Sequence, residues 1–222
     1  MNLESSKNLG GIGAIILLIG VLPIVGTDTF GIIALVGLIL MLVAMRGLAD
    51  YFKENRILTN FLYSAIIIIV GVAVTAATFV YLFFYTTIVT DFLYKIFPTW
   101  DGKWTSLSGL TPVTTGITPS DVIPFIGAVI AVLAIIWIFL IIGSYFARRS
   151  LKTLSTKTNV GLLSTGSLLL LIGAVLTIIG IGIFLIWVAL ILIAIGLFQI
   201  KTQLEQPLTS YASAPPTSPT PV

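Results

Sequence analysis

The amino-acid sequence predicts an all-α membrane protein with six transmembrane helices. Of its 222 residues, 58% are hydrophobic and only 9% are charged, whereas a soluble domain carries about 25% charged residues. The apolar residues also form long runs without a charge, such as 61–89 and 181–198. Runs of about 18 or more apolar residues are typical of membrane spans. The third observation is a Gly-rich apolar stretch that occurs in similar form near both ends of the chain. It predicts how the helices pair.

The hydropathy pattern places the six spans in a single polytopic domain over residues 1–200. We expect them at about 9–25, 30–48, 61–89, 122–147, 161–179 and 183–200. Residues 26–29 are predicted to form a turn, 49–60 and 148–159 to be polar connections, and 97–121 to be an external loop. The tail, 201–222, is rich in Pro, Ser and Thr, which favours a disordered, solvated chain. Docking of a partner in polyproline form is the alternative for this tail.

The last two spans are separated by a turn that no charged residue marks. Residues 168–198 form one apolar stretch in which only Thr177 is polar. A single helix of this length would extend about 46 Å, well beyond the hydrocarbon core of about 30 Å. Gly180 and Gly182 suit a backbone reversal. The sequence therefore predicts a tight hairpin at 180–182.

The distribution of basic residues predicts the orientation in the cell membrane. Nine basic residues fall on one side of the six-span arrangement: Lys7, Arg46, Lys53, Arg56, Arg148, Arg149, Lys152, Lys157 and Lys201. Only Lys95 and Lys103 fall on the other side. Lys and Arg are enriched in cytoplasmic loops, so both termini are predicted to be cytoplasmic.

Two similar Gly-rich hairpins are predicted at the two ends of the chain. GAIILLIGVLPIVG begins at residue 13, and GSLLLLIGAVLTIIG begins at residue 166. Small residues recur every seventh position: Gly13 and Gly20, Gly37 and Ala44, Gly166, Gly173 and Gly180, and Gly182, Ala189 and Gly196. A period of seven places them on one stripe of a helix pair, where small residues allow close approach. They are the predicted helix-packing seam of a parallel repeat. The repeat could have arisen by duplication of a hairpin or by convergence on the same packing.

A more specific prediction concerns the depth of the contacts in the last hairpin. With Ile181 as the centre of the turn, Gly173 and Ala189 are equally distant along the chain. Antiparallel arms of equal length would place these two residues opposite each other.

Three stretches carry a resemblance to a known family. They are SSKNLGGIGAIILLIG, LMLVAMRGLADYFKENRILTN and LLLLIGAVLTIIGIGIFLIWVALILIAI. They resemble an archaeal family of integral membrane proteins, the domain of unknown function 996. The resemblance covers about residues 5–200, with departure expected in the external loop and the tail. It implies an archaeal membrane location and supplies no catalytic or binding residue.

The residue types limit the chemistry that the chain can perform. The sequence has no Cys and no His, which excludes disulfides, thiolate sites and histidine ligation or catalysis. The centres of the spans lack Asp, Glu, Lys and Arg, the usual groups of ion coupling and proton relays. Asp101 and Asp121 are interpreted as solvated carboxylates of the external loop. We predict no catalytic residue, no cofactor and no metal site.

Membrane lipids, a second copy and a larger membrane complex are the expected partners, and nucleic acid is not. The net charge of +3 comes from basic residues scattered at span ends. The candidate lipid headgroup contacts are Arg46, Lys53, Arg56, Arg148, Arg149 and Lys152. Anchoring at the membrane surface explains the same residues without a specific ligand. The external loop, with Trp100 and Trp104, is either an interface cap or a binding loop.

Two functions fit these patterns. The favoured one is a non-enzymatic structural or accessory subunit of a membrane assembly. The alternative is a small channel or transporter for a neutral or apolar solute. A pore would need a continuous polar stripe, and Thr75 and Thr78 offer only a short one. Bonding of these hydroxyls to their own helix is the simpler interpretation.

Overall fold

The computed structural model describes residues 2–21, 29–113 and 115–201, and within these ranges the chain is helical with no strand. The α-helices are α1 Leu3–Gly20, α2 Thr29–Phe52, α3 Asn55–Val80, α4 Ile88–Ile96, α5 Pro119–Thr158, α6 Gly161–Leu176 and α7 Gly182–Phe198. A π-helical turn, η1 Tyr81–Tyr85, extends α3. Two 3-10 segments, η2 Trp104–Gly109 and η3 Thr177–Ile179, lie before α5 and after α6.

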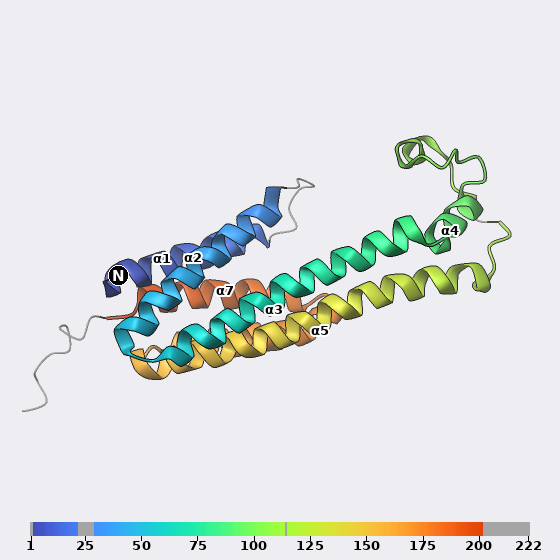
Figure 1. The fold of residues 1–222 in the computed structure, drawn as a ribbon. Helices are drawn as coiled ribbons and strands as arrows, with labels where there is room; N and C mark the ends of the chain where they lie inside the picture. Colours follow the sequence, from blue (N-terminus) through green and yellow to red (C-terminus); the bar gives the residue numbers. More distant parts are fainter. Residues whose placement is uncertain (1, 22–28, 114, 202–222) are drawn as a thin grey trace, which may run out of the picture.

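The helices form three hairpins, which pair α1 with α2, α3 with α5, and α6 with α7. The hairpins contact one another where α1 meets α7, α5 meets α6, and α2 meets α3. The α3–α5 hairpin extends far past the ends of the other two (Figure 1). We call its projecting part, residues 72–85 and 119–138, the α3–α5 arm. No residue of the arm is buried within the chain.

The hydrophobic core lies at the end of the bundle where α1 begins and α7 ends. Its buried members are Leu3, Ala14, Met41, Met45, Leu48, Ala49, Ile57, Phe61, Leu151, Leu154, Leu163, Ile193, Ala194, Leu197 and Ile200. Two hydrogen bonds join helices at this end. Ser150 Oγ donates to the carbonyl of Ile57 at 2.6 Å, and Lys7 Nζ donates to that of Ile200 at 3.1 Å. The positive charge of Lys7 lies beside the C-terminal end of α7, where it also interacts favourably with the helix dipole.

The segments 49–60 and 148–159, predicted as polar connections between spans, are mostly helical. α2 continues to Phe52 and α3 begins at Asn55, while α5 continues to Thr158. Along α5, the residues at 150, 151, 154 and 155 are buried and their charged neighbours lie outside. A helix with one apolar stripe is stabilised by packing that stripe, whatever the charge of its other face.

The third span and the external loop also differ from the prediction. The span predicted over 61–89 ends at Tyr85, because Thr86 has an extended backbone and α4 begins at Ile88. The loop predicted over 97–121 ends earlier, since α5 begins at Pro119. A capping box between Thr118 and Asp121 fixes this start, and proline at the first helical position favours it.

Four helices are long and apolar enough to cross a membrane, judged by length and composition. They cover Gly31–Phe52, Asn55–Tyr85, Pro119–Thr158 and Gly161–Ile179. α7 is apolar but shorter, with 17 residues. α1 runs from Leu3 to Gly20, so it starts before the predicted span 9–25. The predicted turn lies outside the described residues up to residue 28, as does the tail from residue 202.

Candidate functional site: an apolar cleft in the α3–α5 arm

The small residues of the first hairpin lie where α1 and α2 approach most closely. A Cβ atom added to Gly37 would lie 2.5 Å from the amide nitrogen of Leu17. One added to Gly20 would lie 2.3 Å from that of Ala34, and one on Gly13 would lie 2.9 Å from a backbone nitrogen of α2. Ala44 is fully buried. At these three glycines a side chain larger than hydrogen would require the backbones to move apart.

The small residues of the last hairpin lie between α6 and α7 in the same way. A Cβ on Gly166 would lie 3.2 Å from the carbonyl oxygen of Ala189. One on Gly182 would lie 2.1 Å from the carbonyl oxygen of Gly173, and one on Gly196 would lie 2.9 Å from the Leu163 side chain. Gly180 instead lies in the turn, with a φ of 81° and no neighbour within 4 Å.

The predicted pairing of Gly173 with Ala189 was wrong. A Cβ on Gly173 would lie 3.0 Å from the backbone of both Gly182 and Ile186, so Gly173 faces the first turns of α7. The reason is the 3-10 segment Thr177–Ile179, which moves the centre of the turn toward residue 179. The residue of α7 that faces Gly173 is therefore closer to the turn than Ala189, which a turn centred on residue 181 would place opposite it.

Two glycines that the heptad pattern omitted join the two ends of the chain. A Cβ on Gly11 would lie 2.4 Å from the ring of Phe198, and one on Gly10 would lie 3.2 Å from Leu197. These glycines place α1 directly against α7. Gly10 also has the Cβ of Ala44 3.1 Å from its own Cβ position. The two adjacent glycines could have indicated this contact from the sequence, because neighbouring small residues on one helix allow two other helices to approach it.

The candidate lipid headgroup residues are mostly exposed. Arg46, Lys53, Arg56, Arg149 and Lys152 are exposed and Arg148 is half-buried. The Arg149 guanidinium lies 5.9 Å from the centre of the Tyr145 ring, within cation–π range. Glu54 neutralises part of this basic surface, since its carboxylate lies 3.3 Å from Lys157 and 4.0 Å from Arg56. The exposed cations are accessible to anionic groups at this end of the bundle.

Two threonine hydroxyls of α3 bond within their own helix. Thr75 Oγ1 donates to the carbonyl of Gly71 at 2.7 Å, and Thr78 Oγ1 donates to that of Val74 at 2.9 Å. Both hydroxyls are therefore used within their own helix. Trp137 packs between helices, where its indole nitrogen donates to the carbonyl of Val175 in α6 at 3.1 Å.

The segment between α4 and α5 folds into an aromatic cap on the arm. Trp100 is buried, and its indole nitrogen donates to the carbonyl of Lys103 at 2.7 Å. The Trp100 ring lies 4.9 Å from that of Tyr94 and 5.5 Å from that of Trp104. Trp104 also contacts Phe83 at 6.0 Å between ring centres. The two tryptophans thus join the cap to η1.

Charge pairs fix the base of this cap. Lys95 of α4 forms an ion pair with Asp121 at the start of α5. This hydrogen bond, together with those from Thr118, lowers the pKa of Asp121 to about 2. A hydrogen bond from the Ser106 hydroxyl, followed by one from the Lys103 amide, lowers the pKa of Asp101. Both carboxylates have partners within the cap, rather than being merely solvated as the sequence suggested.

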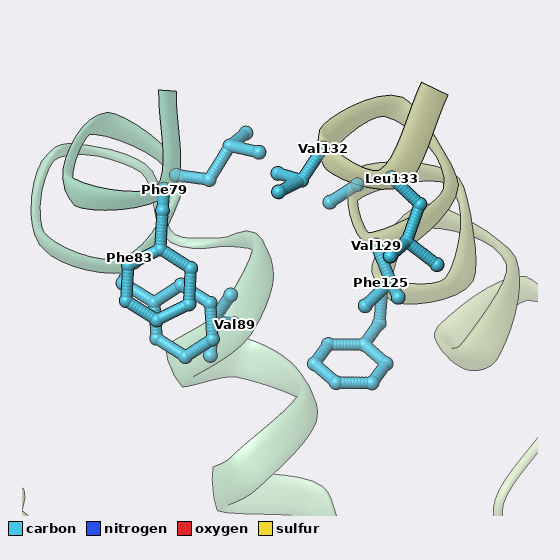
Figure 2. A pocket seen from close by; sticks show the side chains of 9 residues that line it. Phe79, Phe83, Val89, Phe125, Val129, Val132 and Leu133 are labelled. Atoms are coloured by element: carbon cyan, nitrogen blue, oxygen red, sulfur yellow. The ribbon is translucent and has the colours of Figure 1, made fainter. Parts of the chain in front are cut away.

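The cleft of the arm opens between η1 and α5. It has a volume of about 140 Å³ and is lined only by apolar side chains: Phe79, Leu82, Phe83, Val89, Phe125, Ala128, Val129, Val132 and Leu133. Figure 2 shows Phe79, Phe83 and Val89 on one side of the gap and the side chains of α5, Phe125, Val129, Val132 and Leu133, on the other. The ring of Phe125 stacks on that of Phe92 of α4, with 4.3 Å between the ring centres. The sequence did not predict this cleft, because nothing in an apolar run marks where two helices separate.

The cleft can bind hydrocarbon but offers no group for acid–base or nucleophilic chemistry. Its lining has no hydroxyl, amide, carboxylate or cationic side chain. Over residues 2–21, 29–113 and 115–201, no three His, Cys, Asp or Glu residues lie close enough to hold a metal ion. An apolar, partly open site of this kind discriminates by shape rather than by hydrogen bonding.

Residues 33–191 match the protein family described as "Protein of unknown function (DUF996)". The chain belongs to this DUF996 family. It is also 29% identical to an uncharacterised protein of the archaeon Methanocaldococcus jannaschii over 160 residues, which are 72% of this chain and 71% of that protein. No solved structure matches the chain. The DUF996 match begins within α2 and ends within α7, so it includes the cleft and leaves out α1.

Proposed function

We propose that this DUF996 protein is a non-enzymatic accessory subunit of a membrane assembly, whose partner packs against the α3–α5 arm. The observation that carries the proposal is the unequal covering of the helices. In the most apolar stretch of α2, 39% of residues are buried inside the chain, and in that of α6, 28%. The corresponding shares are 6% for α3 and 0% for α5. The arm is therefore the surface with the most room for another membrane helix.

The topology proposed with this function has six membrane-embedded helices, α1, α2, α3, α5, α6 and α7, with both termini in the cytoplasm. The excess of Lys and Arg at one end of the bundle supports this orientation in the cell membrane. Arg46, Lys53, Arg56, Arg148, Arg149 and Lys152 are the proposed contacts with lipid headgroups. The glycines between α1 and α2 and between α6 and α7 are proposed to set how closely each hairpin packs.

The residue inventory supports a role without catalysis. The chain has neither Cys nor His, and the charged groups of the cap are paired with one another. Membrane proteins that move ions or protons usually carry ionisable groups within the bilayer. The arm has none between residues 72 and 85 or between residues 122 and 138.

The mass of the native assembly tests the proposal. The protein would be purified from its own membranes in mild detergent and measured by native mass spectrometry. We expect a species heavier than the 23.8 kDa chain. The double variant Ile126→Trp, Ile130→Trp adds bulk to an exposed side of the arm that lies outside the cleft lining, and it should release the single chain. Ile39→Trp is the control, because it adds the same apolar bulk to an exposed position of α2.

Two results would contradict the accessory role. One is a wild-type protein that occurs as a single chain with lipid alone. The other is an assembly that is equally stable in the arm variant and in the control. Either result would leave the arm without a protein partner.

A second function, a carrier or binding protein for an apolar solute, is favoured by the cleft. Filling the cleft with Val129→Trp would then weaken binding of a pyrene-labelled hydrocarbon in nanodiscs by at least about tenfold. Ile126→Trp, outside the cleft lining, would leave that binding unchanged. Equal binding by wild type and Val129→Trp would exclude the cleft as the site.

A further inference from the structure

The tip of the α6–α7 hairpin is apolar on its outer surface. The chain reverses there through η3 and Gly180. Four large side chains of this tip are exposed: Ile178 by 67%, Ile179 by 62%, Ile181 by 58% and Phe184 by 65%. Turns that face water are built mainly from Gly, Pro, Asn, Asp and Ser. Four exposed aliphatic and aromatic side chains at one turn therefore favour an apolar environment.

Two polar groups near the tip find partners within the hairpin. The hydroxyl of Thr177 donates to the carbonyl of Gly173 at 2.8 Å. The amide of Gly180 donates to the carbonyl of Thr177 at 2.9 Å. Internal pairing of this kind is what a segment in hydrocarbon requires, because water is absent there.

The hydrogen bond between Trp137 and Val175 fixes the depth of the tip relative to α5. From Trp137, α5 extends outward for 16 residues to Asp121, a rise of about 24 Å. From Val175, the last residues of α6 and η3 extend in the same direction by only about 8 Å. The tip therefore lies about 16 Å short of the level where the arm becomes polar.

The length of α5 relates this depth to the bilayer. From Arg149 to Asp121 the helix rises about 42 Å, which matches a bilayer of about 40–45 Å with its headgroups. With these two charged residues in opposite headgroup layers, the hydrocarbon core occupies about the middle 30 Å. The tip then lies about 10 Å inside the outer surface of that core.

We infer that the tip of the α6–α7 hairpin ends in the hydrocarbon of the outer leaflet, in contact with lipid acyl chains rather than with external water. α6 and α7 thus enter from the cytoplasm and return to it without crossing completely. The inference rests on the membrane location and orientation proposed above, and it is independent of the accessory role. It refines the six-helix topology at one hairpin, and α3 and α5 still cross the whole bilayer.

Single cysteines test the depth, because the wild-type chain has none. Ile181→Cys and, as a second variant, Ile178→Cys would be treated in intact cells with a membrane-impermeant maleimide. We expect no labelling of either variant until the membrane is dissolved in SDS. Ser108→Cys in the cap is the external control and should be labelled without detergent. Labelling of the tip from outside at the rate of Ser108→Cys would overturn the inference.

Fluorescence quenching identifies what covers the tip. Ile181→Cys labelled with bimane would be reconstituted into vesicles whose lipids carry a nitroxide on the acyl chain or on the headgroup. We expect quenching at least about twofold stronger from the acyl-chain nitroxide. Stronger quenching from the headgroup nitroxide would contradict the depth. Absence of quenching by either lipid would show that protein, such as a second copy, covers the tip. Labelling of Ser108→Cys only from the cytoplasm would instead contradict the proposed orientation.

Discussion

At the residue scale, the closest backbone approaches in the bundle occur at glycines, and the surroundings of each glycine decide what a methyl group does there. Gly37 and Gly127 both lie inside long helices, α2 and α5. A Cβ on Gly37 would be 2.5 Å from the backbone of α1, whereas one on Gly127 would have no neighbour within 4 Å. The same substitution should therefore have opposite effects at the two sites.

We predict that Gly37→Ala destabilises the protein and that Gly127→Ala stabilises it. At Gly37 the added methyl must push two helices apart, and overpacking costs about 1–3 kcal/mol. At Gly127 the methyl only raises helix propensity, a gain of about 0.5–1 kcal/mol. Thermal unfolding in detergent measures both. Equal melting temperatures of the two variants would show that the α1–α2 contact does not limit side-chain size.

A second prediction at this scale concerns Asp121 and acid. Its ion pair with Lys95 lowers its pKa from 3.8 to about 2 in the folded protein. The stabilisation from this depressed pKa is complete above pH 4 and is lost as the pH falls toward 2. Asp121→Asn should remove this dependence. The measurement is the reactivity of a Val113→Cys reporter in the cap toward 2,2′-dipyridyl disulfide, which still reacts with thiols in acid, between pH 4 and pH 2. An identical acid response of both proteins would contradict the assignment. Because the Lys95 side chain is exposed, salt should weaken the effect.

At the scale of elements, helix ends explain most differences between the sequence-based prediction and the structure. The apolar helices and the chain reversal at Gly180 could be predicted from the sequence, because hydropathy and the length of the apolar runs determine them. The extension of α5 to Thr158 was not, because Arg148, Arg149 and Lys152 dominate the local composition. Burial of Ser150 and Leu154 on one face overrides that composition. The cleft depends on the distance between two helices, and no pattern of residues within a single helix predicts that distance.

The extension of α5 predicts a strong effect of Leu154→Ala. Leu154 is fully buried in the core, so the substitution should cost about 2–5 kcal/mol. Lys152→Ala, on the exposed side of the same turn, should change stability by less than about 0.5 kcal/mol. Thermal unfolding of the pair is the measurement. If both variants melt like wild type, the segment after residue 148 is not part of the packed bundle.

The turn between α2 and α3 offers a stabilising substitution. Lys53 directly follows α2 and has a φ of 50°. This left-handed conformation costs a non-glycine residue roughly 1–2 kcal/mol. Lys53→Gly should therefore raise the melting temperature, as glycine is favoured at such helix ends. Lys152→Gly is the matched control within a helix, where glycine costs about 1 kcal/mol. A lower melting temperature for Lys53→Gly would contradict this account of the turn.

At the scale of the whole molecule, the structure divides into a packed end and an exposed arm. The packed end brings both termini of the described chain together, through Gly10 and Gly11 against α7 and through Lys7 at Ile200. The arm carries the cleft and the aromatic cap away from this core (Figure 1). Such a division suits a protein that is anchored at one membrane surface and offers apolar surface toward the other.

We propose that the α3–α5 hairpin crosses the membrane completely, with its cap outside and the end of α5 on the cytoplasmic side. Ser108→Cys in the cap and Thr156→Cys near the end of α5 are both exposed and lie at opposite ends of this hairpin. The most direct measurement is their labelling by an impermeant maleimide in intact cells and in inside-out vesicles. We predict that Ser108→Cys reacts only in cells and Thr156→Cys only in vesicles. Reaction of both cysteines from the same side would contradict the claim.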